Sequence, residues 1–373
     1  MANDRPDTKL AQIGNGFDEL GAVSAPIYLS TAYRHRGIGI SKGYDYIRTG
    51  NPTRSILERT IADIEGGQEA FACSSGMSAI QLIFMLFSSG DHIIASRDLY
   101  GGTYRLFQIL ADHYHICFSP WDGESTEQLE ALIRPETKAL FIETPTNPLM
   151  REVNLVEVSA LAKAKDILLI VDNTFYTPIL QRPLTLGANL VIHSATKYLG
   201  GHNDVLAGIV VSNTLKVSEK LREYHNACGA VLDPFDSWLL IRGMKTLALR
   251  MERHQSNARK VVEYLHSQPL VAKIHYPGKG GMISFEITNQ SDVEPFLKAL
   301  QLITFAESLG GVESLITYPA TQTHADIPEA LRLKYGLTNT LLRLSTGIEA
   351  PEDLIADLER AFASLQKEAV LHD

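Results

Sequence analysis

Leu190-Val-Ile-His-Ser-Ala-Thr-Lys-Tyr-Leu-Gly-Gly-His-Asn203 is the stretch that decides how the rest of the chain is interpreted. It opens with an apolar run typical of a buried strand, and small hydroxyl residues and Lys197 follow that run. Burial and nearby positive charge lower the pKa of a lysine, and a neutral lysine amine attacks carbonyl compounds. Lys197 is therefore a candidate nucleophile, although a lone lysine after a strand is more often an ordinary surface residue.

The composition is that of a globular chain, with 373 residues of which 45% are apolar and 21% charged. This length predicts two or three domains. The net charge of -9 argues against nucleic acid or an anionic membrane as a partner, because both are bound by clustered basic side chains. The cysteines Cys73, Cys117 and Cys228 are scattered and odd in number, so we expect free thiols. The start of the chain does not resemble a signal peptide, and no apolar run is long enough to span a membrane, which predicts a cytoplasmic protein.

Strand-like apolar runs alternate with helical patterns through the first half of the chain. The expected strands are residues 70–73, 92–96, 139–143, 167–172 and 190–193, and the expected helices are residues 52–66, 77–87, 103–112 and 153–165. This alternation predicts a mostly parallel sheet covered on both faces, with its ligand at the carboxyl ends of the strands.

The second half of the chain has a different pattern. One long helix is expected over residues 234–267, and shorter strands and helices follow it. We therefore predict an α/β protein in three parts. These are an arm at residues 1–48 that contacts a neighbouring subunit, a large domain at 49–235 and a smaller α/β C-terminal domain at 236–373.

Two features at the expected strand ends could hold a ligand. Ser74-Ser-Gly-Met77 lies between a strand and a helix, where free backbone N–H groups suit a phosphate, although it could also be a simple helix cap. Asp172 could cap a helix or pair with a protonated ring nitrogen. An acid for such a nitrogen together with Lys197 is the pairing that pyridoxal phosphate (PLP) enzymes use. Ser194 and Thr196 could donate to the same phosphate.

Two further motifs carry an aromatic ring and a guanidinium. In Asp98-Leu-Tyr-Gly-Gly-Thr-Tyr-Arg105, Tyr100 could stack on a flat ring, unless it is an ordinary surface tyrosine. In Tyr46-Ile-Arg-Thr-Gly-Asn-Pro-Thr53, Arg48 can bind a phosphate, assisted by the hydroxyl of Tyr46. Because this motif ends the arm, it would most simply reach the site of a neighbour.

Nearly the whole chain closely resembles the PLP enzymes of cysteine and methionine metabolism, the cystathionine gamma-synthase and lyase family. Besides the motifs above, the resemblance is carried by Glu143-Thr-Pro-Thr-Asn-Pro148, Val171-Asp-Asn-Thr174, Ala306-Glu-Ser-Leu-Gly-Gly311 and Arg343-Leu-Ser-Thr-Gly-Ile-Glu349. It implies PLP transferase fold type I, similar to aspartate aminotransferase. It also implies a homo-oligomer, an active dimer that can pair into a tetramer.

The resemblance assigns roles to individual residues. The residues expected in catalysis are Lys197, which would hold the cofactor covalently, Asp172 at the ring nitrogen and Tyr100 stacked on the ring. The remaining expected cofactor contacts are Ser75, Gly76, Met77, Asn147, Ser194 and Thr196, with Tyr46 and Arg48 from the adjacent subunit. The expected contacts to an amino-acid substrate are Asn147, Arg105, Glu307, Ser308 and Arg343. A structural salt bridge is the alternative role for Arg343, and no metal site is expected, because the histidines lack ligand spacing.

The implied reaction is γ-replacement on O-acetyl- or O-succinylhomoserine, with cysteine giving cystathionine or with sulfide giving homocysteine, in methionine biosynthesis. Gly102 stands where methionine gamma-lyases resemble one another in carrying a reactive cysteine, which argues against that branch. Thr49 stands where succinyl-using synthases carry a second arginine, which favours the acetyl ester. The alternatives are cystathionine gamma-lyase or beta-lyase activity and a PLP-binding regulator without catalysis.

Overall fold

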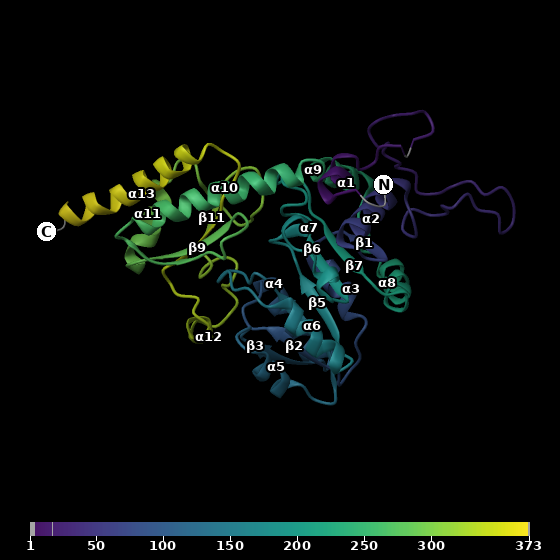
Figure 1. Cartoon of the computed structure of the whole chain (residues 1–373), viewed down its shortest axis with the longest axis horizontal. Coiled ribbons are helices and arrows are strands. Elements are labelled where there is room, and N and C mark those ends of the chain that lie inside the picture. The colour runs from purple at the N-terminus through teal and green to yellow at the C-terminus, as the bar shows by residue number, and fades with distance from the viewer. Residues whose placement is uncertain (1–3, 17, 372–373) are drawn as a thin grey trace.

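A computed structural model of the chain describes residues 4–16 and 18–371, without the side chains of residues 366–371. The first three residues and Phe17 of the predicted arm, and the last two residues of the predicted C-terminal domain, lie outside the described part. Two sheets lie side by side along the long axis, with the arm beyond the larger sheet and the last helix beside the smaller one (Figure 1).

The larger sheet is mixed but mostly parallel, with the strand order β1-β7-β6-β5-β4-β2-β3. Its strands are β1 Glu69–Cys73, β2 His92–Ser96, β3 Cys117–Trp121, β4 Thr137–Glu143, β5 Leu168–Asp172, β6 Leu190–Ser194 and β7 Gly208–Ser212. The five strands from β6 to β3 run parallel, and β7 is antiparallel to both of its neighbours. The prediction of a mostly parallel sheet is confirmed.

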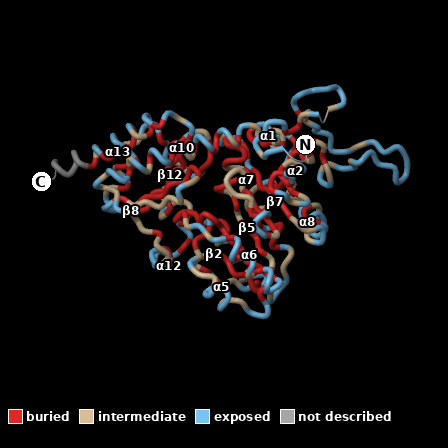
Figure 2. The backbone as a smooth tube through the Cα atoms, viewed as in Figure 1, coloured by how far each residue is buried: buried red, intermediate tan, exposed pale blue. Residues whose placement is uncertain are grey.

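Helices bury both faces of this sheet, as a parallel sheet requires. They are α2 Pro52–Glu65, α3 Gly76–Phe84, α4 Gly101–Tyr114, α5 Thr126–Leu132, α6 Leu155–Ala164, α7 Thr177–Leu180 and α8 Leu215–Cys228. Alternation along β6 sends Val191 into one apolar core, with α2 and α6, and Ile192 into the other, with α3 and α4. Figure 2 shows the sheet as the most continuously buried part of the chain.

The single helix expected over residues 234–267 is wrong, because the chain forms two helices there, α9 Pro234–Met244 and α10 Leu247–His266. Arg250 donates from Nη2 to the carbonyl of Gly243 at 2.8 Å and from Nε to Thr246 Oγ1 at 3.1 Å, and these bonds fix α10 against the end of α9. An apolar pattern that continues across both helices does not reveal such a break.

The smaller sheet has the order β10-β11-β12-β9-β8 and is antiparallel apart from the β10–β11 pair. Its strands are β8 Val271–His275, β9 Met282–Ile287, β10 Thr304–Phe305, β11 Leu315–Thr317 and β12 Leu341–Ser345, and its helices are α11 Val293–Ala299, α12 Glu329–Lys334 and α13 Pro351–Leu371. Leu247 of α10 joins the core of the larger domain and Val261 that of the smaller one, so the boundary near residue 235 stays a prediction. None of the described helices is both long and apolar enough to cross a bilayer.

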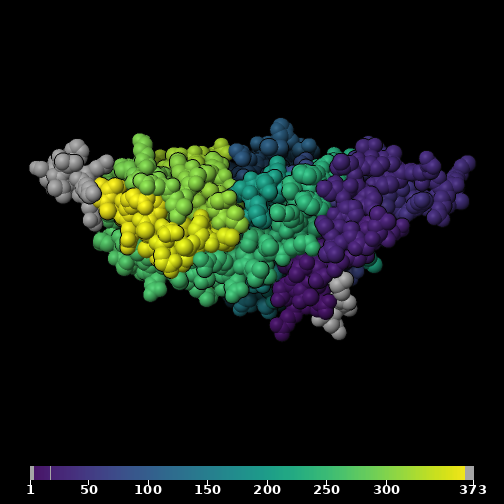
Figure 3. All heavy atoms as spheres, turned by 90° about the horizontal axis from the view of Figure 1, so that it is seen from above, coloured from purple at the N-terminus to yellow at the C-terminus, as the bar shows by residue number. Residues whose placement is uncertain are grey.

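The N-terminal arm has two unlike parts. The helix α1, Pro6–Ala11, packs on its own chain through the buried side chain of Leu10, and Ile13 just after it is buried as well, so the expectation of an extended arm is wrong here. Residues 18–50 extend away from the body and are mostly exposed (Figures 2 and 3). Their exposed apolar side chains are Leu20, Val23, Tyr28, Leu29, Ile38, Ile40 and Tyr46. Apolar side chains gathered on an exposed segment are typical of a surface that binds a partner.

Candidate active site

A cavity of about 230 Å³ opens at the carboxyl ends of the strands of the larger sheet, facing the smaller domain. The predicted site residues that line it are Ser75, Gly76, Met77, Tyr100, Asn147, Asp172, Ser194, Thr196, Lys197, Glu307, Ser308 and Arg343. They come from both domains, and the position of the cavity is the one that an open α/β sheet predicts. Among the described residues, no group of three His, Cys, Asp or Glu side chains could hold a metal ion.

Lys197 lies in the turn that follows β6 and reaches toward the smaller domain. Its Nζ donates to Ser308 Oγ at 3.1 Å. Burial, aided by the positive charge of Arg343, lowers the pKa of Lys197 to about 8. Gly310, with a φ of +76°, packs so closely here that a Cβ would lie 2.7 Å from the backbone nitrogen of Tyr198. The lysine is therefore a largely desolvated amine whose neutral form is accessible near physiological pH.

Asp172 ends β5 and uses one of its two carboxylate oxygens for the backbone. Its Oδ1 accepts from the backbone nitrogen of Thr174 at 3.0 Å and from the hydroxyl of Thr174 at 2.6 Å. Burial raises the pKa of Asp172 even though both bonds from Thr174 oppose that shift. Oδ2 has no hydrogen-bond partner among the described residues, so this oxygen could accept from a cationic ring nitrogen in the cavity.

The turn before α3 supplies neutral donors. Ser75 is the N-cap, and its Oγ accepts from the backbone nitrogen of Ser78 at 3.0 Å, so the helix-cap interpretation is correct for this side chain. The N–H groups of Gly76 and Met77 come first in the helix and have no intrahelical acceptor, which leaves them for an anion. A Cβ on Gly76 would lie 2.9 Å from Ser194 Oγ, so the turn and β6 close tightly on each other.

The other hydroxyls at this end differ in availability. Ser194 Oγ has no partner in the described part of the chain, whereas Thr196 Oγ1 donates to the carbonyl of Ala207 at 3.1 Å and accepts from its N–H at 3.0 Å. The cationic side chains that line the cavity are Lys197 and Arg343. Both are hydrogen-bonded to Ser308, in the smaller domain. The turn before α3, where a phosphate would bind, therefore has no cationic side chain beside it in this chain.

Glu143 lines the cavity but was not predicted as a site residue. Its Oε2 accepts from the backbone nitrogen of Tyr100 at 3.1 Å and its Oε1 accepts from that of Asn147 at 2.9 Å. Burial, and next the charge of Asp172 on the neighbouring strand, raises the pKa of Glu143 well above its usual value. One carboxyl group therefore positions two predicted site residues. The available signal was a carboxylate at the end of a buried strand, as at Asp172.

Arg343 is a buried cation held only by neutral groups. It is 2% exposed, and it donates from Nη1 to Asn147 Oδ1 at 2.8 Å and from Nη2 to the carbonyl of Ser308 at 3.2 Å and Thr317 Oγ1 at 3.1 Å. Its hydrogen-bond partners among the described residues are all neutral atoms, so the structural salt bridge considered for this residue is not formed. An unpaired buried guanidinium is costly, and a carboxylate ligand would relieve that cost.

Three predicted site residues lie outside the cavity. Tyr46 is 48% exposed, and Arg48 donates from Nη1 to the carbonyl of Asn226 at 2.5 Å and to its Oδ1 at 3.0 Å. Arg105 donates to Asp326 Oδ2 at 2.7 Å, and both side chains are more than half exposed. A single chain therefore does not bring Tyr46, Arg48 or Arg105 to the other site residues.

The residues present fit PLP. The cavity combines an amine with a lowered pKa, a carboxylate oxygen without a partner and free N–H groups at a helix N-terminus. Lys197 would hold the aldehyde, Asp172 would face the ring nitrogen, and Gly76, Met77 and Ser194 would donate to the phosphate.

Comparison with known proteins agrees with this fit. Residues 7–363 match the family described as Cys/Met metabolism PLP-dependent enzyme. The chain is 59% identical to a cystathionine gamma-synthase/O-acetylhomoserine (thiol)-lyase of Bacillus subtilis, covering 98% of both chains, and 57% identical to a cystathionine gamma-synthase of Haemophilus influenzae, covering 96% of this chain and 98% of that one. It also matches the solved structure of a cystathionine gamma-lyase from Lactobacillus plantarum complexed with L-serine, with a TM-score of 0.95, 47% identity and coverage of 97% and 100%. The predicted fold type is thereby confirmed.

Proposed function

The chain belongs to the Cys/Met metabolism PLP-dependent enzyme family, and from this premise we propose that it catalyses γ-replacement on an activated homoserine ester. Cysteine as the thiol would give cystathionine, and sulfide would give homocysteine. The proposal is supported by relatives that are 59% and 57% identical and are named as gamma-synthases.

The observation that carries the proposal is a buried Arg343 without a carboxylate partner in the cavity that holds Lys197. Arg343 and Asn147 would bind the α-carboxylate of an amino acid, which directs its Cα toward the lysine. Bound PLP supplies an electron-accepting ring that stabilises negative charge at Cα. Asp172 would hold a proton at the ring nitrogen through its free oxygen. With a pKa of about 8, Lys197 can accept a proton from Cα and return one, and it can also take a proton from Cβ so that the γ-acyloxy group leaves.

The turn around Gly102 supports the synthase over a methionine gamma-lyase. A Cβ at this position would lie 2.5 Å from Tyr100 Cε1 and 3.1 Å from Met77 Sδ. A cysteine here would therefore displace the ring of Tyr100, whereas glycine leaves it over the cavity.

A substrate panel tests the reaction. We expect cystathionine from O-acetylhomoserine plus cysteine, slower turnover of O-succinylhomoserine, and slow cleavage of cystathionine. Rapid cleavage of cystathionine without synthesis would instead establish the lyase, which the 47% identical lyase structure keeps as the second candidate. If amino acids left the absorbance of the lysine-bound cofactor unchanged, the chain would be a regulator.

The missing cation at the phosphate end supports a site shared between two copies of the chain. Tyr46 and Arg48 are exposed at the end of an arm with many uncovered apolar side chains. In a homodimer, this arm would cover the neighbour and bring Arg48 to the neighbour's phosphate. Pairing of dimers and a cytoplasmic location stay predictions.

A further inference from the structure

The start of α2 anchors the exposed arm near Pro26 and Tyr28, where the chain leaves the body. Thr53 Oγ1 donates to the carbonyl of Pro26 at 2.9 Å and accepts from the backbone nitrogen of Tyr28 at 2.9 Å. Asn51 Nδ2 donates to the carbonyl of Tyr28 at 2.7 Å. This end of the arm is therefore fixed by side chains that are themselves fully buried.

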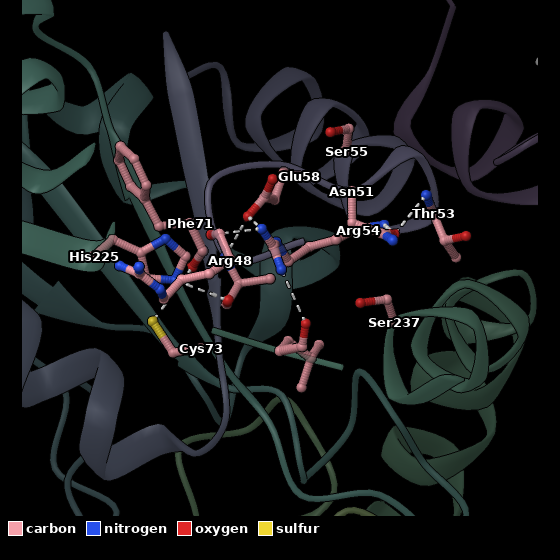
Figure 4. Close-up of polar contacts among 12 residues, drawn as sticks. Arg48, Asn51, Thr53, Arg54, Ser55, Glu58, Phe71, Cys73, His225 and Ser237 are labelled. Carbon is pink, nitrogen blue, oxygen red and sulfur yellow. Dashed lines mark hydrogen bonds and ion pairs between the residues drawn. The ribbon is translucent and has the colours of Figure 1, made fainter. Parts of the chain in front are cut away.

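Arg54, the next residue of α2, anchors the arm near Ile47 and Arg48, where the chain returns to the body. Its Nη2 donates to the carbonyls of Ile47 at 2.9 Å and Arg48 at 3.1 Å, and its Nη1 donates to the carbonyl of Leu232 at 3.3 Å. The side chain is 3% exposed and lies between the arm and the body of the larger domain (Figure 4). One guanidinium thus fixes the backbone from which the side chain of Arg48 extends.

Glu58, one helical turn further on, holds Arg54 against the larger sheet. Its Oε1 lies 3.6 Å from Arg54 Nε and accepts from the backbone nitrogen of Ala72 at 2.9 Å. Ala72 belongs to β1, which leads directly into the turn at Ser75. Glu58 therefore supports Arg54 from a strand backbone that does not line the cavity.

A buried arginine is costly to desolvate unless its N–H groups are hydrogen-bonded, and Arg54 donates to three carbonyls. A lysine has no planar fork and cannot reach two successive arm carbonyls and a third carbonyl in fixed directions. Neither Arg54 nor Glu58 lines the cavity of its own chain.

We propose that Arg54 and Glu58 are positioning residues for the active site of a second copy of the chain, where they direct Tyr46 and Arg48 toward that copy's cofactor phosphate. This inference rests on the shared site put forward under the proposed function. It predicts that a substitution of Arg54 weakens PLP binding in the site of the neighbouring chain and not in the site of the chain that carries the substitution.

The first test uses Arg54→Lys in the full-length protein. We expect the dissociation constant for PLP, followed by the absorbance of the lysine-bound cofactor, to rise about fivefold, because the cation at the phosphate is no longer held in one direction. Arg59→Lys, on the exposed side of the same helix, is the matched control and should leave the constant unchanged. If Arg54→Lys does not fold, Glu58→Gln, which keeps an acceptor for Ala72, should give a smaller rise. An unchanged constant in a folded variant would overturn the inference.

The second test uses mixed dimers made by co-expression with two affinity tags. In a dimer of one Arg54→Lys chain and one Lys197→Ala chain, the remaining lysine site receives an intact arm, so its PLP dissociation constant should return to the wild-type value. If the wild-type lysine site is instead paired with a chain that carries both substitutions, its constant should be raised.

Arg48→Ala in the same two arrangements separates the two proposals. If Arg48→Ala acts across the dimer and Arg54→Lys acts only within its own chain, the positioning inference is wrong and the shared site stands. If Arg48→Ala also acts only within its own chain, the shared site itself is wrong.

Discussion

The cavity and the arm both carry residues that were predicted to bind one cofactor, yet they are built in opposite ways. Arg343 is buried and Lys197 and Asp172 are half-buried, and they come together because the strand ends of the larger sheet face β12 of the smaller one. Tyr46 and Arg48 lie on an exposed segment whose position depends on a few side chains at its base. The difference agrees with the proposal that one chain brings together the groups for the ring, while a second copy supplies the cation for the phosphate.

The strongest test of the cavity is Lys197→Ala. Loss of the nucleophile and proton carrier should lower kcat by at least about 10³-fold and abolish the absorbance of the lysine-bound cofactor. Lys298→Ala, at an exposed i,i+4 pair with Glu294, is the control. Substantial turnover by Lys197→Ala would show that the reaction does not depend on this lysine and would contradict the assignment of the cavity as the active site.

Arg343→Lys tests whether the cavity alone recognises the substrate. Lysine keeps the charge but loses the fork that Asn147 and Thr317 hold, at a cost of about 2 kcal/mol. The KM for the homoserine ester should rise about 30-fold, with a smaller change in kcat. A fall in kcat at constant KM would show instead that Arg343 contributes only after the substrate has bound.

Arg48→Ala tests the arm, and we expect a smaller effect of a different kind. The dissociation constant for PLP should rise about tenfold, while the KM of the PLP-saturated enzyme stays near the wild-type value. Arg36→Ala, another exposed arginine of the arm, is the control. Equal effects of the two substitutions would mean that the arm contributes only general positive charge.

The pH dependence of cofactor loading should give the smallest effect. Lys197 attacks only as the neutral amine, and its pKa is lowered to about 8 because the ammonium is desolvated and lies near Arg343. The rate of PLP loading should therefore rise from pH 7 to 9 and level off above that. Glu307 raises this pKa, so Glu307→Gln should move the midpoint to lower pH. Stopped-flow absorbance measures both midpoints. A wild-type midpoint near 10.5, the ordinary pKa of lysine, would contradict the lowering of the pKa of Lys197 by desolvation.

Several elements of the fold could be predicted because their signals are local. β2 has the predicted bounds, and β5 and β6 each differ from theirs by one residue. β3 was not predicted, because it is an edge strand that contains Pro120 and is only partly buried. Helix α1 was also missed, since a helix of 6 residues gains its stability from tertiary packing, here of Leu10 and of Ile13 just beyond its end.

The sequence by itself determined which chemical groups are available and which strand ends carry them, because a buried strand is visible as a run of apolar residues that are neighbours in the sequence. Only the tertiary structure decided which of these groups meet. Asn147 and Arg343 are separated by 196 positions and still share a hydrogen bond, whereas Arg105 pairs with Asp326 outside the cavity and Arg48 binds the end of α8. The physical reason is that a side chain's partners are set by the packing of distant elements, which no local pattern encodes.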